Sequence, residues 1–211
     1  MLFGNPALKP LADLAKAAVR SPENFNWTFI ALFAVVVILY LGELEKKNYK
    51  IIAAALALYS VHWFYEIMNA VICYITGYAL WTVSPESTSF ILLIGVSWEL
   101  SMMFAIAGFT AKALPADKDM KIFGINNRIV FAIGSALFFS LVEIFLAWTP
   151  AFIWVYPWWG ALPVFVTTYI PFFLASYLIY DAKPKTQKRF IITLAAINAI
   201  LLIVLIPLGI I

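Results

Sequence analysis

The chain has 211 residues, of which 64% are hydrophobic, 17% aromatic and only 12% charged. Soluble globular domains contain about 45–50% apolar and about 25% charged residues, so one soluble domain of this length cannot bury such an excess. The composition predicts an integral membrane protein and excludes a soluble enzyme, a nucleic-acid-binding protein, a disordered chain and a disulfide scaffold. The net charge is only +3, and a single cysteine, Cys73, cannot form an intramolecular disulfide.

Six charge-poor stretches are long enough to cross the roughly 30 Å of hydrocarbon in a bilayer as helices. In chain order they are residues 26–42, 51–77, 88–111, 129–149, 162–180 and 190–211. Together they leave almost no chain for a soluble domain. We therefore expect an all-α integral membrane protein in which residues 26–211 form a single domain, a bundle of six transmembrane helices.

Residues 1–25 precede the first predicted span and follow a different pattern. Leu8, Leu11, Leu14 and Ala18 recur there with helical spacing among polar residues. A helix with one apolar face is typical of a segment that lies in the membrane interface. We therefore expect residues 1–25 to form an N-terminal interfacial amphipathic segment, separate from the membrane-spanning bundle.

The distribution of Lys and Arg predicts the orientation in the membrane, because cytoplasmic loops carry an excess of these residues. Eleven basic residues fall in three of the five connections between predicted spans, and the other two connections have none. The basic connections are residues 43–50, 112–128 and 181–189. We expect these loops to be cytoplasmic and both termini to be outside, although the N-terminal segment adds three basic residues on that side.

Four ionisable residues interrupt the predicted spans, namely His62, Glu66, Glu99 and Glu143. A charged group at the centre of a bilayer costs a few kcal/mol, so such residues usually face the bundle interior and have a partner. At about 1.5 Å per helical residue, His62 and Glu99 lie about level, and Glu66 and Glu143 lie level one turn further out. We expect the four to converge in one intramembrane site that opens toward the outer side.

Other residues of these helices are expected to line the same cavity. On the helix that carries His62, further polar and aromatic residues share the face of His62 or lie beside it. In the fourth predicted span, a serine precedes Glu143 by three residues. In the fifth predicted span, polar residues lie between two prolines. The expected lining residues are Tyr59, Trp63, Asn69, Trp98, Ser140, Thr168 and Tyr169. The plainer interpretation is that these groups hold the bundle together by hydrogen bonds, worth about 0.6 kcal/mol each on average.

Acid–base chemistry on a hydrophobic substrate, such as a lipid or an isoprenoid, is the leading interpretation of the four ionisable residues. Neighbouring carboxyl groups in unlike environments provide a proton donor and a proton acceptor, and aromatic neighbours stabilise a cationic intermediate. His62, Glu66, Glu99 and Glu143 would be catalytic in an isomerase- or lyase-type membrane enzyme. Whether the protein is an enzyme stays open at this point.

Three short segments resemble a known family. His62-Trp-Phe-Tyr-Glu66, Trp98-Glu99-Leu-Ser and Val142-Glu143-Ile-Phe are similar to the motifs of the sterol Δ8–Δ7 isomerase, or emopamil-binding (EXPERA), family. The resemblance implies a small helical bundle whose cavity protonates a sterol double bond, with His62, Glu66 and Glu99 matching the family's histidine and glutamates. The chain departs from that family in a shorter loop after the second span and in an added sixth span.

Two other classes stay open. His62, Glu66, Glu99 and Glu143 are suitable ligands for a mononuclear divalent metal, although no cofactor is predicted. Midplane carboxylates also suit a proton, cation or small-solute channel, or an accessory subunit of a membrane complex. The expected partners are membrane lipid and a hydrophobic small molecule, with homo-oligomer formation open and no nucleic acid.

Overall fold

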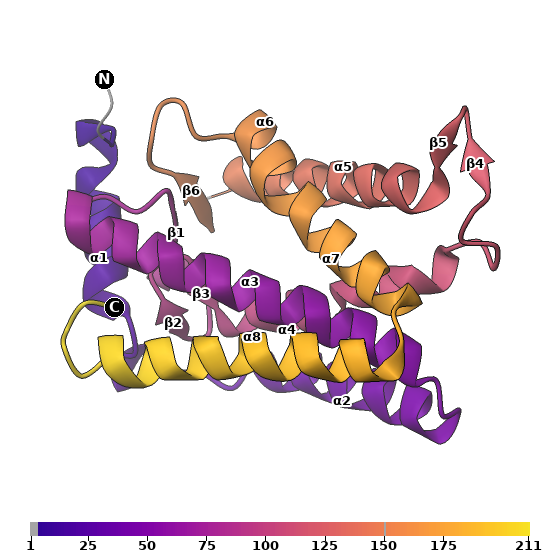
Figure 1. Cartoon of the computed structure of the whole chain (residues 1–211). Coiled ribbons are helices and arrows are strands. Elements are labelled where there is room, and N and C mark those ends of the chain that lie inside the picture. Colours follow the sequence, from indigo (N-terminus) through magenta and orange to yellow (C-terminus); the bar gives the residue numbers. More distant parts are fainter. Residues whose placement is uncertain (1–3, 150) are drawn as a thin grey trace.

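The computed structural model describes residues 4–149 and 151–211, and most of them are helical. The helices are α1 (Lys9–Ala18), α2 (Phe29–Glu45), α3 (Tyr49–Thr76), α4 (Trp98–Ala107), α5 (Asn127–Ala147), α6 (Ala161–Val164), α7 (Ile170–Asp181) and α8 (Pro184–Leu205). The strands are β1 (Trp81–Val83), β2 (Ile91–Leu93), β3 (Val96–Ser97), β4 (Lys121–Ile122), β5 (Ile125–Asn126) and β6 (Phe152–Trp154). The strands form three antiparallel pairs, β1–β6, β2–β3 and β4–β5 (Figure 1).

Among the described residues, four helical segments are long and apolar enough to cross a membrane, and they correspond to four of the predicted spans. They are Tyr49–Thr76, Asn127–Ala147, Ala161–Asp181 and Pro184–Leu205. The third of these joins α6 and α7 through a π-helical turn, η5 (Phe165–Tyr169). The prediction of a mostly helical chain with long apolar helices is therefore confirmed.

The third predicted span, residues 88–111, is wrong as a continuous membrane helix. The β2–β3 hairpin occupies its first half, and α4 has only 10 residues, about 15 Å in length. The helix begins where it does because the Ser97 side chain accepts a hydrogen bond from the Leu100 backbone N–H at 3.4 Å. The strands β2 and β3 are almost completely buried in protein. Their hydropathy therefore reflects a protein interior and not contact with lipid.

The first predicted span, residues 26–42, corresponds to α2, which begins and ends three residues later in the chain than predicted. Helix α2 has 17 residues, about 25 Å, and is apolar with most of its side chains exposed. It packs along α4 and α3 at the edge of the bundle. Because α2 is shorter than the four spanning helices and residues 88–111 do not form one helix, six spans are not confirmed.

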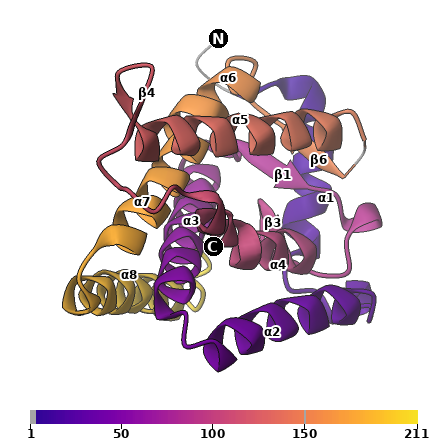
Figure 2. The ribbon, with the colours of Figure 1, turned by 90° about the vertical axis from the view of Figure 1, so that its right-hand side faces the viewer.

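Helix α3 lies at the centre of the molecule and packs against α7, α8 and α4 (Figure 2). Four alanines of α3 are buried against its neighbours, Ala53, Ala54, Ala55 and Ala57. Small side chains let helix backbones approach closely, which is how helices associate in a membrane. The Ser176 hydroxyl of α7 donates a hydrogen bond to the Ala54 carbonyl oxygen at 3.0 Å, so α7 lies directly on this part of α3.

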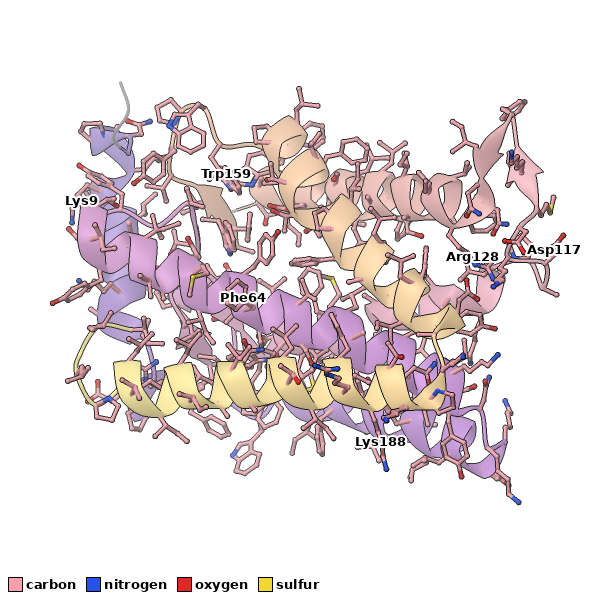
Figure 3. All side chains as sticks on the ribbon, viewed as in Figure 1. Lys9, Phe64, Asp117, Arg128, Trp159 and Lys188 are labelled. Carbon is pink, nitrogen blue, oxygen red and sulfur yellow. The ribbon has the colours of Figure 1, made fainter. Side chains whose placement is uncertain are left out.

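The bundle has two unlike ends. Figure 3 shows Arg128, Asp117 and Lys188 at one end, with Lys9 and Trp159 toward the other. We call the first the basic end, because all three basic connections lie there, and the second the ribbon end, because the β1–β6 pair lies there. At the basic end Arg128 holds Asp181 with two hydrogen bonds, from Nε at 2.7 Å and from Nη2 at 3.0 Å, which ties the start of α5 to the end of α7.

Helix α1 crosses the ribbon end at a steep angle to α3 and α8 (Figures 1 and 2). It buries Ala12, Ala15 and Ala18 against the rest of the protein and leaves Leu11 and Leu14 exposed. The structure therefore shows a helix within the predicted N-terminal segment, with leucines on its outer face. That this helix lies in the membrane interface stays a prediction.

Candidate functional site

A narrow cavity lies in the half of the bundle nearer the ribbon end, between α3, α4, α5 and the η5–α7 segment. Its polar lining residues are His62, Glu66, Trp81, Glu143, Thr168 and Tyr169. Its other lining residues are Gly95, Leu100, Met103, Phe104, Phe139, Val142, Leu146, Phe152, Val164 and Phe172. The free space is about 30 Å³, room for about two water molecules. The cavity is therefore a mostly apolar slot with a small polar centre.

Helix α3 places His62 and Glu66 one turn apart on the same face, and both side chains are almost completely buried, at 1% and 4% exposure. His62 Nε2 lies 3.3 Å from Glu66 Oε1. The imidazole ring stacks on the Phe104 ring of α4, with 4.1 Å between ring centroids. The aromatic contact limits movement of the ring, so the imidazole is held beside the Glu66 carboxylate.

Helix α5 contributes Glu143 from the opposite side of the cavity. This carboxyl group is 6% exposed, and its Oε1 accepts a hydrogen bond from Trp154 Nε1 at 2.7 Å. Glu143 also shares the cavity wall with Tyr169 of η5. Its hydrogen-bond donor Trp154 is a neutral indole, whereas Glu66 has an imidazole beside it. The two glutamates of the cavity therefore have chemically different surroundings.

The β1–β6 pair, which we call the ribbon, connects the two glutamates. Trp81 of β1 and Trp154 of β6 are direct partners in its antiparallel register. Trp81 Nε1 lies 3.3 Å from Glu66 Oε1 and 3.2 Å from Oε2 and donates to this carboxylate, as Trp154 does to Glu143. Each carboxyl group of the cavity is therefore bound by an indole N–H from the same ribbon.

The π-helical turn η5 brings Thr168 and Tyr169 into the cavity wall. Its cause is visible in the backbone, because Pro171 has no N–H to donate to the Thr167 carbonyl oxygen four residues earlier. That oxygen instead accepts a hydrogen bond from the Tyr65 hydroxyl of α3 at 2.9 Å. Single π-helical turns within α-helices occur frequently at functional sites. The prolines on either side of these residues in the sequence therefore indicate a true departure from α-helical geometry, the π-helical turn at the cavity.

Two cavity residues have buried polar atoms without a hydrogen-bond partner among the residues that the structure describes. They are Nδ1 of His62 and Oγ1 of Thr168; Nε2 of His62 also makes no hydrogen bond, although it lies 3.3 Å from Glu66 Oε1. Buried polar groups in proteins almost always have a partner, in the protein or in ordered water. Because both residues line the same small space, a water molecule or a polar group of a ligand in the cavity would complete their hydrogen bonding.

The structure brings together His62, Glu66 and Glu143 but places Glu99 elsewhere, which corrects the prediction that all four converge. Glu99 lies in the first turn of α4, where its Oε1 accepts a hydrogen bond from the Ser89 backbone N–H at 2.7 Å. The depth of Glu99 was estimated by counting residues along a straight helix from residue 88. The hairpin β2–β3 replaces the first part of that helix, so the count placed Glu99 at the wrong position.

Some of the other predicted lining residues also line the cavity in the structure, and the rest lie outside it. Thr168 and Tyr169 line the cavity, and Tyr59, Trp63, Asn69, Trp98 and Ser140 do not. The Tyr59 hydroxyl pairs with Ser101 at 2.8 Å, and the Trp98 ring stacks on Phe29 at the outside of α4. These residues share a helix face with the site or flank it, but other parts of the chain cover them. Catalytic roles for the cavity residues stay predictions.

Sequence reasoning missed the two ribbon tryptophans. Aromatic residues in the connections 78–87 and 150–160 are typical of an interfacial belt, because membrane proteins place tryptophan at headgroup level. In the structure Trp81 is 7% exposed and points into the protein, whereas Trp158 is 49% exposed. Tryptophan content alone does not separate these positions, and the only strand signal in Phe152-Ile153-Trp154 is the weak preference of aromatic and β-branched residues for strands.

The ligand set expected for a metal is not assembled, because Glu99 lies apart from the other three residues. Within residues 4–149 and 151–211, no group of three or more His, Cys, Asp and Glu side chains is placed to hold a metal ion. Metal binding therefore has no geometric support at the positions predicted for it.

A family model described as "Uncharacterized membrane protein family" matches residues 9–207. A protein of Archaeoglobus fulgidus, described as an uncharacterized protein, is 42% identical over 198 residues, which cover 92% of this chain and 94% of the relative. No solved structure matches the chain.

The resemblance to the sterol Δ8–Δ7 isomerase family is therefore wrong, because the matching family is a different one and covers nearly the whole chain. The resemblance depended on three short segments around glutamates. Of the glutamates in these segments, Glu99 does not line the cavity.

Proposed function

The chain belongs to this uncharacterized membrane protein family, and we propose that it is an integral membrane enzyme whose cavity performs acid–base chemistry on a hydrophobic, membrane-soluble molecule. The observation that carries the proposal is the pair Glu66 and Glu143. Two buried carboxyl groups from different helices line one small cavity, and each is bound by its own indole N–H. Carboxyl groups in unlike environments provide a proton donor and a proton acceptor.

The surroundings of the two glutamates suggest which one donates. An ionised carboxylate buried in an apolar interior is costly unless a cationic partner lies beside it. Glu66 has His62 at 3.3 Å, so this pair can hold a carboxylate and an imidazolium together. Glu143 has neutral neighbours, Trp154 and Tyr169. We assign the proton donor to Glu143 and the acceptor to Glu66, with His62 stabilising the acceptor.

The walls of the cavity support access from the membrane and not from the basic end. On the basic side, a layer of packed rings closes the cavity, formed by Phe104, Phe139, Phe172 and Phe173. On the opposite side lies the ribbon. Between α4 and α5, which touch each other little, the lining side chains Met103 and Val142 are half-buried. An apolar molecule that displaces these side chains would reach both carboxyl groups laterally.

The same layer of aromatic rings favours catalysis over ion conduction. A conducting path requires polar groups or water across the membrane, and packed phenylalanines supply neither. The free space of about 30 Å³ also restricts what reacts there to a small part of a substrate, such as one double bond or one functional group. The reaction type that fits is a proton addition followed by a proton removal, as in an isomerisation or a cyclisation.

The proposal is tested without knowing the substrate, by incubating the purified protein in D₂O with total lipid extract from cells that produce it naturally. Acid–base chemistry at carbon places solvent deuterium in a lipid, and mass spectrometry of the lipids detects it. We expect one or more lipid species to gain deuterium with native protein and not with heat-denatured protein. Equal deuterium content in the two samples would reject acid–base catalysis on these lipids.

We also propose that the basic end is cytoplasmic and the ribbon end outside, from the asymmetry of Lys and Arg between the connections. Cysteine labelling tests this orientation in a Cys73→Ala background, in which the introduced cysteine is the one thiol of the chain. A membrane-impermeant thiol reagent should label Trp158→Cys in intact cells, and Lys118→Cys only after the membrane is permeabilised. Labelling of Lys118→Cys in intact cells would reverse the assigned orientation.

A further inference from the structure

We infer that Asn69 is a positioning residue that sets the hydrogen bonding of both cavity carboxyl groups through the ribbon, including Glu143 on a helix it does not touch. The inference rests on the proposed function only for its effect on catalysis. The coupling itself is a property of the fold, and it is measurable whether or not the protein is an enzyme.

Asn69 lies on α3 three residues after Glu66, on the same face, and is 1% exposed. Its side-chain Oδ1 accepts a hydrogen bond from the Leu80 N–H at 2.7 Å, and its Nδ2 donates to the Trp81 carbonyl oxygen at 2.9 Å. One amide thus holds the backbone on both sides of the peptide that joins these two residues, as a neighbouring strand would. Helix α3 therefore carries both Glu66 and the group that fixes the strand donating to Glu66.

The ribbon carries this constraint to the other side of the cavity. Trp81 and Trp154 are register partners, and partners in an antiparallel pair have Cβ atoms about 4.5–5.5 Å apart on the same face. A further backbone hydrogen bond joins the strands beside them, from the Val155 N–H to the Leu80 carbonyl oxygen at 3.0 Å. A shift of β1 therefore moves β6, and with it the indole that donates to Glu143.

The turn of the β2–β3 hairpin packs closely against Asn69, Trp81 and Glu66. A Cβ atom at Gly95 would lie 2.4 Å from Asn69 Nδ2, 2.4 Å from Trp81 Nε1 and 2.7 Å from Glu66 Oε2. All three groups therefore meet at one glycine, where no side chain has room. Because the Gly95 backbone lies so close to these groups, β1 has little room to move to a new position when the Asn69 amide is removed.

The test is the indole N–H resonances in a ¹H–¹⁵N spectrum of ¹⁵N-tryptophan-labelled protein, with those of Trp81 and Trp154 assigned by Trp→Phe replacement. Asn69→Leu removes both amide hydrogen bonds at similar volume. We expect both resonances to shift toward weaker hydrogen bonding. Asn198→Leu is the matched control, because Asn198 is also buried and also binds a backbone carbonyl of α3, that of Ser60 at 2.8 Å. It should move neither resonance.

A shift of Trp81 alone in Asn69→Leu would overturn the inference, as would equal shifts in the Asn198→Leu control. If Asn69→Leu does not fold, Asn69→Asp gives the same readout, because it keeps the acceptor for Leu80 and loses the donor to Trp81. Coupled shifts in a protein that exchanges no deuterium into lipids would support the role of Asn69 and reject the proposed function. The two ideas therefore fail separately.

Discussion

Replacing Gly108 by alanine is expected to destabilise the fold by about 3 kcal/mol or more, with a fall in Tm on the order of 10 °C. Gly108 follows α4 and packs directly on α3. A Cβ atom there would lie 2.4 Å from the Ala55 Cα and 2.8 Å from the Ala54 carbonyl oxygen. Both are backbone atoms of a central helix, so relief of the clash requires α3 and α4 to separate.

Gly134→Ala is the matched control for this prediction. Gly134 lies within α5, and no heavy atom lies within 4 Å of a Cβ built there. Alanine has a helix propensity about 1 kcal/mol more favourable than glycine, so the Tm of this variant should stay equal or rise slightly. Thermal unfolding of both variants in the same detergent makes the comparison. Equal Tm values for Gly108→Ala and the unmodified protein would contradict the close contact of the two helices.

Hydropathy and length predicted the long helices of this fold because lipid demands about 20 apolar residues in one run. They failed for residues 88–111, where an equally apolar run folds as a buried hairpin and a short helix. A strand buried on both faces and part of a membrane helix have the same composition over a few residues. The only local signals for the break were Gly95 in the hairpin turn and Ser97 as the cap of α4.

For the candidate site, sequence reasoning found the residues whose position depends on a regular helix. Glu66 and His62 lie one turn apart wherever the helix lies, and Glu143 was placed level with Glu66 by counting along two straight helices. The tryptophan donors could not be found in this way. Trp81 and Trp154 are 73 positions apart, and only the pairing of two short strands brings them together.

Replacing either cavity glutamate by glutamine is expected to lower the rate of deuterium incorporation into lipid by about 10²–10⁴-fold, the usual contribution of a general acid or base. Glutamine has nearly the same volume, and its carbonyl oxygen still accepts the indole hydrogen bond from Trp81 or Trp154. It has no acidic proton to donate and cannot accept one at neutral pH. The Tm of Glu66→Gln and Glu143→Gln should therefore change little while the chemistry is lost.

Glu99→Gln supplies the matched control for these variants. It makes the same chemical change in the same protein, at a glutamate that lies outside the cavity and accepts a hydrogen bond from the Ser89 backbone. The amide oxygen keeps that hydrogen bond. If buried glutamates served only to hold the bundle together, all three glutamine variants would behave alike, with losses of a fraction of a kcal/mol in stability.

The comparison of Glu143→Gln with Glu99→Gln in the D₂O assay tests the central claim most directly, with equal amounts of folded protein confirmed by thermal unfolding. The account predicts that Glu99→Gln places deuterium in lipid at about the rate of the unmodified protein. It predicts a rate at least about 10²-fold lower for Glu143→Gln. Equal rates for the two variants would contradict acid–base chemistry at the carboxyl pair of this cavity.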